Sequence, residues 1–220
     1  MFFYPLRIFI DDLLDIKGPH TENVDNFCVG RLVGSMRLPA PPATLRVARA
    51  LTAFSQQDAA DRAGVTRRYI STAETSESMF TLNLALVDFY VSQGIEFLGQ
   101  AMIGGEVQGA GARWRAPFSP TNPGNDFSQY QAEDLGISFR AARALLNKTQ
   151  SVVAEEIGLH VATVKALERG DHWVAASEAV QEYYERNDVV FLGWSDAATK
   201  RFYGVGVRWR QAELHAPRMD

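Results

Sequence analysis

Side chains that commonly carry out chemistry are few in this sequence, and they are far apart. The chain has one cysteine, Cys28, and four histidines whose spacing does not fit a metal site: His20, His160, His172 and His215. It contains no glycine-rich phosphate loop, no His-Glu-x-x-His arrangement and no Gly-x-Ser-x-Gly elbow. We therefore expect a protein that is not an enzyme and that holds no metal and no cofactor.

The composition is that of a globular chain, with 46% hydrophobic and 22% charged residues. A single cysteine cannot form an intramolecular disulfide, which favours a reducing, cytoplasmic setting. No apolar run approaches the roughly 18 residues that a membrane helix needs, so no membrane partner is expected. The net charge of −4 argues against a nucleic-acid partner only at first sight, because binding depends on the charge of one face rather than on the total.

An internal repeat is the strongest pattern in the chain. Residues 45–51, Leu-Arg-Val-Ala-Arg-Ala-Leu, correspond to residues 139–145, Phe-Arg-Ala-Ala-Arg-Ala-Leu, at an offset of 94 positions. The same offset relates three further pairs: Gln56 and Gln150, Gly64 and Gly158, and Glu74 and Glu168. After one inserted residue, Arg113-Trp114-Arg115 corresponds to Arg208-Trp209-Arg210. We interpret the chain as two copies of one unit.

The repeat predicts four segments along the chain. They are an N-terminal extension (1–44), a first unit (45–115), a linker (116–138) and a second unit (139–212). The linker is rich in proline and glycine, as expected of an extended connection. The N-terminal segment allows two accounts. Its alternating apolar residues could form a strand that pairs with a hairpin edge, or it could be a disordered arm ahead of Met36.

Each unit is expected to contain short helices followed by a β-hairpin. A helix beginning near Arg46 or Arg140 precedes a second helix, whose start is marked by Ser55 or Thr149. The second helix ends at the glycine that the repeat preserves, where a left-handed residue is favoured. A third helix closes near Glu74 or Glu168, and a fourth covers about 82–92 or 175–185. Phe97-Leu98 and Arg113-Trp114-Arg115, with their counterparts, are expected to form the hairpins.

The spacing of glutamine, alanine, glycine and glutamate in residues 45–79 and 139–173 resembles the lambda-repressor/Cro-like (XRE) family of helix-turn-helix regulators. The resemblance implies a mainly α fold with two tandem helix-turn-helix domains, each followed by a small β-hairpin. It implies a bacterial or phage transcription regulator, nucleoid-associated, that reads a two-part operator in the major groove of double-stranded DNA. It also implies that Arg49–Glu74 and Arg143–Glu168 tie the first helix to the end of the third.

The resemblance assigns DNA-binding roles to equivalent positions of the two units. In the first unit Arg67, Arg68, Ser71 and Thr72 face the bases, Thr66 caps the third helix and Gln56 contacts phosphate. In the second unit the same places are occupied by Val161, Ala162, Lys165 and Ala166, with His160 at the cap and Gln150 on phosphate. Since Val161 and Ala162 could touch only thymine methyl groups, the second unit could read DNA weakly, read a different half-site, or not read DNA.

A different class of function is also compatible with the sequence. The fold could serve a protein-binding regulator, anti-activator or antitoxin-like, that captures a partner through the second unit or the N-terminal segment. The net negative charge, the apolar third helix of the second unit and the aromatic N-terminal segment favour this alternative. A mixed version places the first unit on DNA and the second on a partner or on its own twin. A homodimer of the chain would present four units.

Overall fold

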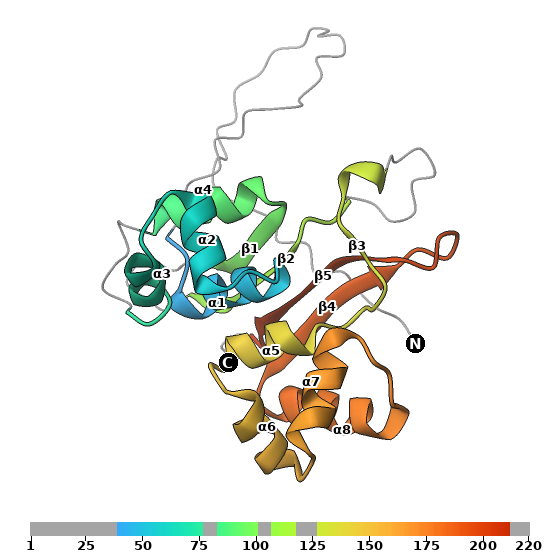
Figure 1. Cartoon of the computed structure of the whole chain (residues 1–220). Coiled ribbons are helices and arrows are strands. Elements are labelled where there is room, and N and C mark those ends of the chain that lie inside the picture. Colours follow the sequence, from blue (N-terminus) through green and yellow to red (C-terminus); the bar gives the residue numbers. More distant parts are fainter. Residues whose placement is uncertain (1–38, 77–82, 101–106, 118–126, 212–220) are drawn as a thin grey trace, which may run out of the picture. The chain divides into compact units, whose positions relative to one another are not determined.

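The computed structural model describes residues 39–76, 83–100, 107–117 and 127–211 (Figure 1). The chain divides into two compact parts, 1–36 and 37–220, and all of the described residues belong to the part 37–220. Both accounts of the N-terminal segment therefore lie outside the described residues.

The helices are α1 (Pro42–Leu51), α2 (Gln56–Ala63), α3 (Arg67–Ala73), α4 (Leu84–Ser92), α5 (Phe139–Leu145), α6 (Gln150–Ile157), α7 (Val161–Arg169) and α8 (Val174–Arg186). The strands are β1 (Ile95–Gln100), β2 (Gln108–Trp114), β3 (Ala132–Glu133), β4 (Val189–Ser195) and β5 (Phe202–Trp209).

The fold is mixed α/β, with eight α-helices and one five-stranded antiparallel sheet in the described part of the chain. A mainly α fold with two separate hairpins was expected. The hairpins β1–β2 and β4–β5 do form, but β2 also pairs with β5 and joins them into a single sheet. The predicted linker adds β3, which pairs with the other end of β5. Sequence patterns locate strands but do not show which hairpin edges will pair.

Local sequence signals explain the helix boundaries. The Ser55 hydroxyl accepts from the Asp58 amide and the Asp58 carboxylate accepts from the Ser55 amide, which is the capping box that the sequence predicts. The helices α2 and α6 end at Gly64 and Gly158, whose φ angles are 67° and 75°. Both glycines adopt the left-handed conformation that was expected.

The two hairpins have the same register and the same irregularity. Phe97 faces Ala112 in the first, and Phe191 faces Val207 in the second. Each hairpin is irregular one residue after its Phe-Leu pair, between Leu98 and Gln100 and between Leu192 and Trp194. The glycines at these two points, 99 and 193, both have positive φ. The two hairpins therefore agree in register and in backbone conformation.

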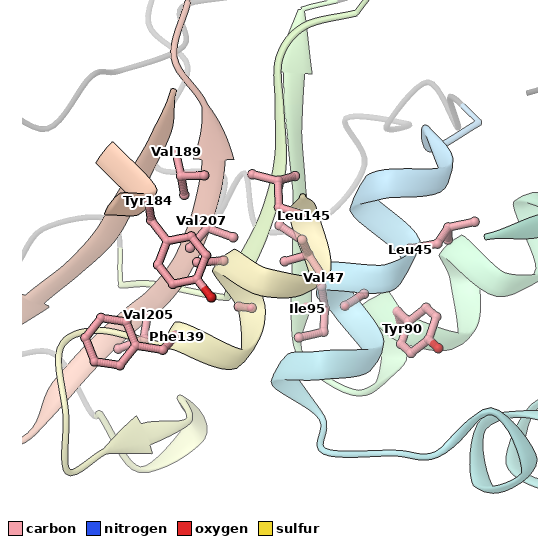
Figure 2. Close-up of a cluster of buried hydrophobic side chains, with 14 of the residues drawn as sticks. Leu45, Val47, Tyr90, Ile95, Phe139, Leu145, Tyr184, Val189, Val205 and Val207 are labelled. Atoms are coloured by element: carbon pink, nitrogen blue, oxygen red, sulfur yellow. The ribbon is translucent and has the colours of Figure 1, made fainter. Parts of the chain in front are cut away.

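One hydrophobic core connects the two halves of the described chain, the first half up to residue 117 and the second from residue 127. Buried side chains of α1, α5, α8 and the strands belong to a single cluster (Figure 2). Val47 of α1 and Leu145 of α5 are both almost fully buried in it, and these two helices pack against each other. Trp114 of the first hairpin belongs to the cluster, and Trp209 of the second packs against it. The two halves therefore share a core as well as a sheet.

Gly206 is predicted to be irreplaceable at the junction between β2 and β5. A Cβ atom at this position would overlap the carbonyl oxygen of Ala112 and the backbone of Arg113. We expect Gly206→Ala to cost about 3 kcal/mol in the free energy of unfolding, measured by urea denaturation. Gly158→Ala is the matched control, because a Cβ there meets nothing within 4 Å and only the left-handed φ is strained, at about 1 kcal/mol. Equal losses for the two variants would contradict the prediction.

Candidate nucleic-acid interface

The helices α6 and α7 are joined by a tight turn that fixes the position of α7. The Thr149 hydroxyl accepts from the Val152 amide at 3.3 Å and caps α6. After Gly158, the Leu159 amide donates to the Ala154 carbonyl at 2.9 Å, and α7 begins two residues later. His160 occupies the expected N-cap position of α7, but its side chain makes no cap hydrogen bond.

A buried ion pair fixes the end of α7 against α5. Arg143 Nε lies 2.5 Å from Glu168 Oε1 and Arg143 Nη2 lies 3.0 Å from Oε2, while the Gln150 amide donates to the same carboxylate at 2.7 Å. The Glu168 side chain is only 2% exposed. Burial by itself would lower the pKa of Arg143, but the hydrogen bond and the charge of Glu168 raise that pKa above its ordinary value. The predicted structural ion pair is confirmed.

The first half contains the same arrangement between α1, α2 and the end of α3. Arg49 donates two hydrogen bonds to Glu74, at 2.5 and 3.0 Å, and the Gln56 amide donates a third at 3.0 Å. The Glu74 side chain is 3% exposed, so this predicted pair is also confirmed. In both glutamines one side-chain N–H donates to a glutamate. The predicted phosphate contact would therefore have to use the other N–H of the same amide group. That contact stays a prediction.

Sequence reasoning missed Arg46, which lies between the two halves. Its guanidinium donates to the Glu74 carbonyl at 2.5 Å and to the Ala144 carbonyl of α5 at 2.9 Å. Burial lowers the pKa of Arg46 from its ordinary value. The repeat aligns Arg46 with Arg140, but an offset between residues carries no information about contacts from one copy to the other.

The face of α3 that was assigned to the bases presents two cations. Arg67 and Arg68 are exposed, whereas Ser71 and Thr72 are half-buried. The Thr66 hydroxyl accepts from the Tyr69 amide at 3.1 Å, which confirms its predicted role as cap. Two side chains of the helix, Ile70 and Ala73, are buried in the core. The arginines therefore project from a helix that is held at its start and along its inner face.

The corresponding face of α7 is much less polar. Ala162 and Lys165 are exposed, Val161 is half-buried against the core, and His160 is exposed. Ala166 is only 4% exposed, which removes it from the set of residues that could reach a base. Lys165 is therefore the one cation among the assigned base-facing positions of α7.

Beside these helices, the two halves use different chemistry at equivalent positions. In the second half Lys148 Nζ donates to both carboxylate oxygens of Glu156, at 2.9 and 2.6 Å, and the Tyr183 hydroxyl donates to Glu156 as well. In the first half the same three places hold Phe54, Arg62 and Phe89. There the Arg62 guanidinium lies 4.7 Å from the centre of the Phe54 ring, a cation–π contact, and the two phenylalanine rings are neighbours. The two clusters occupy positions related by the offset of 94 residues, but neither cluster was predicted from the sequence.

The polar cluster predicts a defined pH dependence of stability. Hydrogen bonds from Lys148 and Tyr183 lower the pKa of Glu156, and the hydrogen bond to Glu156 raises the pKa of Lys148. The contribution of the carboxylate is therefore complete above its unfolded-state pKa, about 4.5, and is lost as the pH falls through the lowered folded-state value. The contribution of Lys148 is present below about 10.5 and is lost as the pH rises through its raised value.

We expect Glu156→Gln to lower the urea midpoint at neutral pH and to leave it unchanged in strong acid, where both proteins are uncharged at this position. Glu182→Gln is the matched control, because that carboxylate lies 3.9 Å from Arg186 on an exposed surface and should contribute much less. A difference between wild type and Glu156→Gln that is constant from acid to neutral pH would refute this assignment.

Residues 139–181 match the family model described as helix-turn-helix. This segment, which contains α5, α6 and α7 and the first part of α8, is therefore one XRE-type helix-turn-helix domain, and such a domain indicates DNA binding and transcription regulation. Searches among curated proteins and among solved structures found no match. In the described part of the chain no helix is long and apolar enough to span a membrane, and no group of three metal-ligating side chains occurs.

Proposed function

We propose that the chain is a sequence-specific DNA-binding transcription regulator with two DNA-reading units, the matched domain and a second, divergent copy built from α1, α2 and α3. The internal agreement of the two halves supports the second copy. Each half has a capped second helix, a left-handed glycine and a third helix in succession. Each half also buries an arginine–glutamate pair with a glutamine on the same carboxylate.

The observation that carries the proposal is the exposed pair Arg67 and Arg68 on a helix that is otherwise fixed in place. An arginine can donate two hydrogen bonds to O6 and N7 of guanine, which discriminates against other bases by about 1–3 kcal/mol. The exposed Ala162 and half-buried Val161 of α7 suit thymine methyl groups instead, and Lys165 suits guanine or phosphate. The two units are therefore expected to prefer different half-sites.

The test is selection of bound sequences from a random pool of double-stranded DNA with the full chain. We expect an enriched site in two parts. Arg67→Ala/Arg68→Ala should relax the sequence preference in one part, and Lys165→Ala should affect only the other. An enriched site with a single part would leave one DNA-reading unit, and the absence of any enriched sequence would contradict the proposed function.

A second candidate function is favoured by two exposed apolar side chains. Trp173 and Val174, at the beginning of α8 in the matched domain, are 50% and 61% exposed. Such residues suit a contact with another protein. If the regulator acts by capturing a protein, Trp173→Ala/Val174→Ser should abolish its effect on transcription in cells, and Arg67→Ala/Arg68→Ala should leave that effect intact. The DNA-reading function predicts that the arginine variant is the one that loses activity.

A further inference from the structure

The junction between β2 and β5 is symmetric in the terms of the repeat. Ala112 and Val207 occupy equivalent positions of the two hairpins, each opposite a phenylalanine, and they are paired directly with each other. On either side, Gly111 pairs with Arg208 and Arg113 pairs with Gly206. Since Gly111 is equivalent to Gly206, and Arg113 to Arg208, each contact recurs with the partners exchanged. This reciprocity is the signature of a two-fold axis.

The close approach of the backbones obeys the same symmetry. A Cβ atom on Gly111 would overlap the carbonyl oxygen of Val207, and a Cβ atom on Gly206 would overlap the carbonyl oxygen of Ala112. These are equivalent glycines against equivalent carbonyl groups. Both strands therefore need glycine at this point for one reason, which is the short distance between the two copies of the strand.

The helices α1 and α5 are also equivalent in the repeat. They pack against each other, and both contact strands of the joined sheet (Figure 1). An axis through an antiparallel pair, perpendicular to the sheet, keeps two such helices on the same face of the sheet. A translation along the chain direction would instead pair strands in parallel, and β2 and β5 are antiparallel.

We propose that a single chain binds an inverted repeat with two unequal halves, the centre of the site corresponding to the axis between Ala112 and Val207. This inference rests on the proposed function, because it requires that both units read DNA. Two units related by rotation read half-sites in opposite orientation, just as a two-fold symmetric dimer reads a palindrome. One half is read by Arg67 and Arg68 of α3, and the other by the apolar face of α7 with Lys165.

The proposed two-fold relation between the two DNA-reading units can be tested by making the base-facing surfaces of α3 and α7 alike. Arg67→Val/Arg68→Ala/Ser71→Lys/Thr72→Ala gives α3 the side chains that α7 carries at its assigned positions. Val161→Arg/Ala162→Arg/Lys165→Ser gives α7 those of α3 except Thr72, whose counterpart Ala166 is buried. Either variant of the full chain, once urea denaturation shows that it is folded, is used to select bound sequences from random double-stranded DNA. Val161 is half-buried, so its replacement by arginine is a less conservative change than the substitutions in α3. The α3 variant therefore serves as the test if the α7 variant does not fold.

The symmetrised variants should enrich a perfect inverted repeat, and the wild-type complex should contain one chain for each site, measured by light scattering. Enrichment of a direct repeat, or of a single half-site, would overturn the inference while leaving DNA binding in place. Two chains on each wild-type site would overturn the claim that one chain suffices. No enriched sequence with the wild-type chain would overturn the proposed function itself.

Discussion

Arg67→Ala/Arg68→Ala is expected to weaken binding to the preferred DNA site by about 100-fold, or about 3 kcal/mol. Both arginines are exposed on α3, and the variant removes their hydrogen bonds to base edges without touching the buried face of the helix. Affinity for DNA of unrelated sequence should fall much less, because contacts to phosphate do not depend on sequence. Equilibrium titration of both DNAs at one salt concentration measures the two effects.

A control for the loss of two positive charges is Arg186→Ala/Arg210→Ala. These arginines are exposed and lie at the end of α8 and just after β5, where each is near one carboxylate at 3.9 and 3.6 Å. We expect this variant to keep the preference for the site. If the two double variants lose specific affinity equally, the effect is one of net charge, and α3 is not a base-reading helix.

Glu168→Ala is expected to destabilise the chain by about 3 to 5 kcal/mol, the typical cost of removing one partner from a buried ion pair. The Glu168 carboxylate accepts three hydrogen bonds, two from Arg143 and one from Gln150, and its side chain is 2% exposed. When the Glu168 carboxylate is removed, the half-buried Arg143 guanidinium loses its charged partner. Urea denaturation gives the change in the free energy of unfolding.

Glu182→Ala is the control for this prediction, because Glu182 and Arg186 form an exposed pair at 3.9 Å on α8. Its loss should cost well under 1 kcal/mol. The equivalent change in the first half, Glu74→Ala, should resemble Glu168→Ala, since Glu74 accepts from the equivalent residues, Arg49 and Gln56, at nearly the same distances. A cost for Glu168→Ala as small as that of the control would show that the buried pair does not hold α7 in place.

Local features of the fold were predictable because neighbouring residues determine them. The Ser55 cap and the left-handed Gly64 and Gly158 follow from residue type and position within a helix. The ion pairs were predictable for another reason: the resemblance to the helix-turn-helix family implied them, and both Arg49 and Arg143 precede a glutamate by 25 positions. A pattern that occurs twice is much stronger than one that occurs once.

Contacts between the two halves could not be predicted. The pairing of β2 with β5 depends on Gly111 and Gly206 being close to backbone from the other hairpin, and nothing local distinguishes these glycines from those of a turn. The bond from Arg46 to the Ala144 carbonyl joins residues 98 positions apart. The buried Ala166 shows the same limit at the candidate interface, because only the packing of α7 decides which of its residues face outward.

Genome-wide crosslinking and sequencing of the tagged full chain would show whether this chain reads DNA through α3 as well as through the matched domain. Arg67→Ala/Arg68→Ala, expressed at the same level, is measured beside it. We expect sharp peaks that share one two-part motif and that disappear in the double variant. Peaks that persist unchanged in the variant, or no enrichment over background with the wild-type chain, would contradict it.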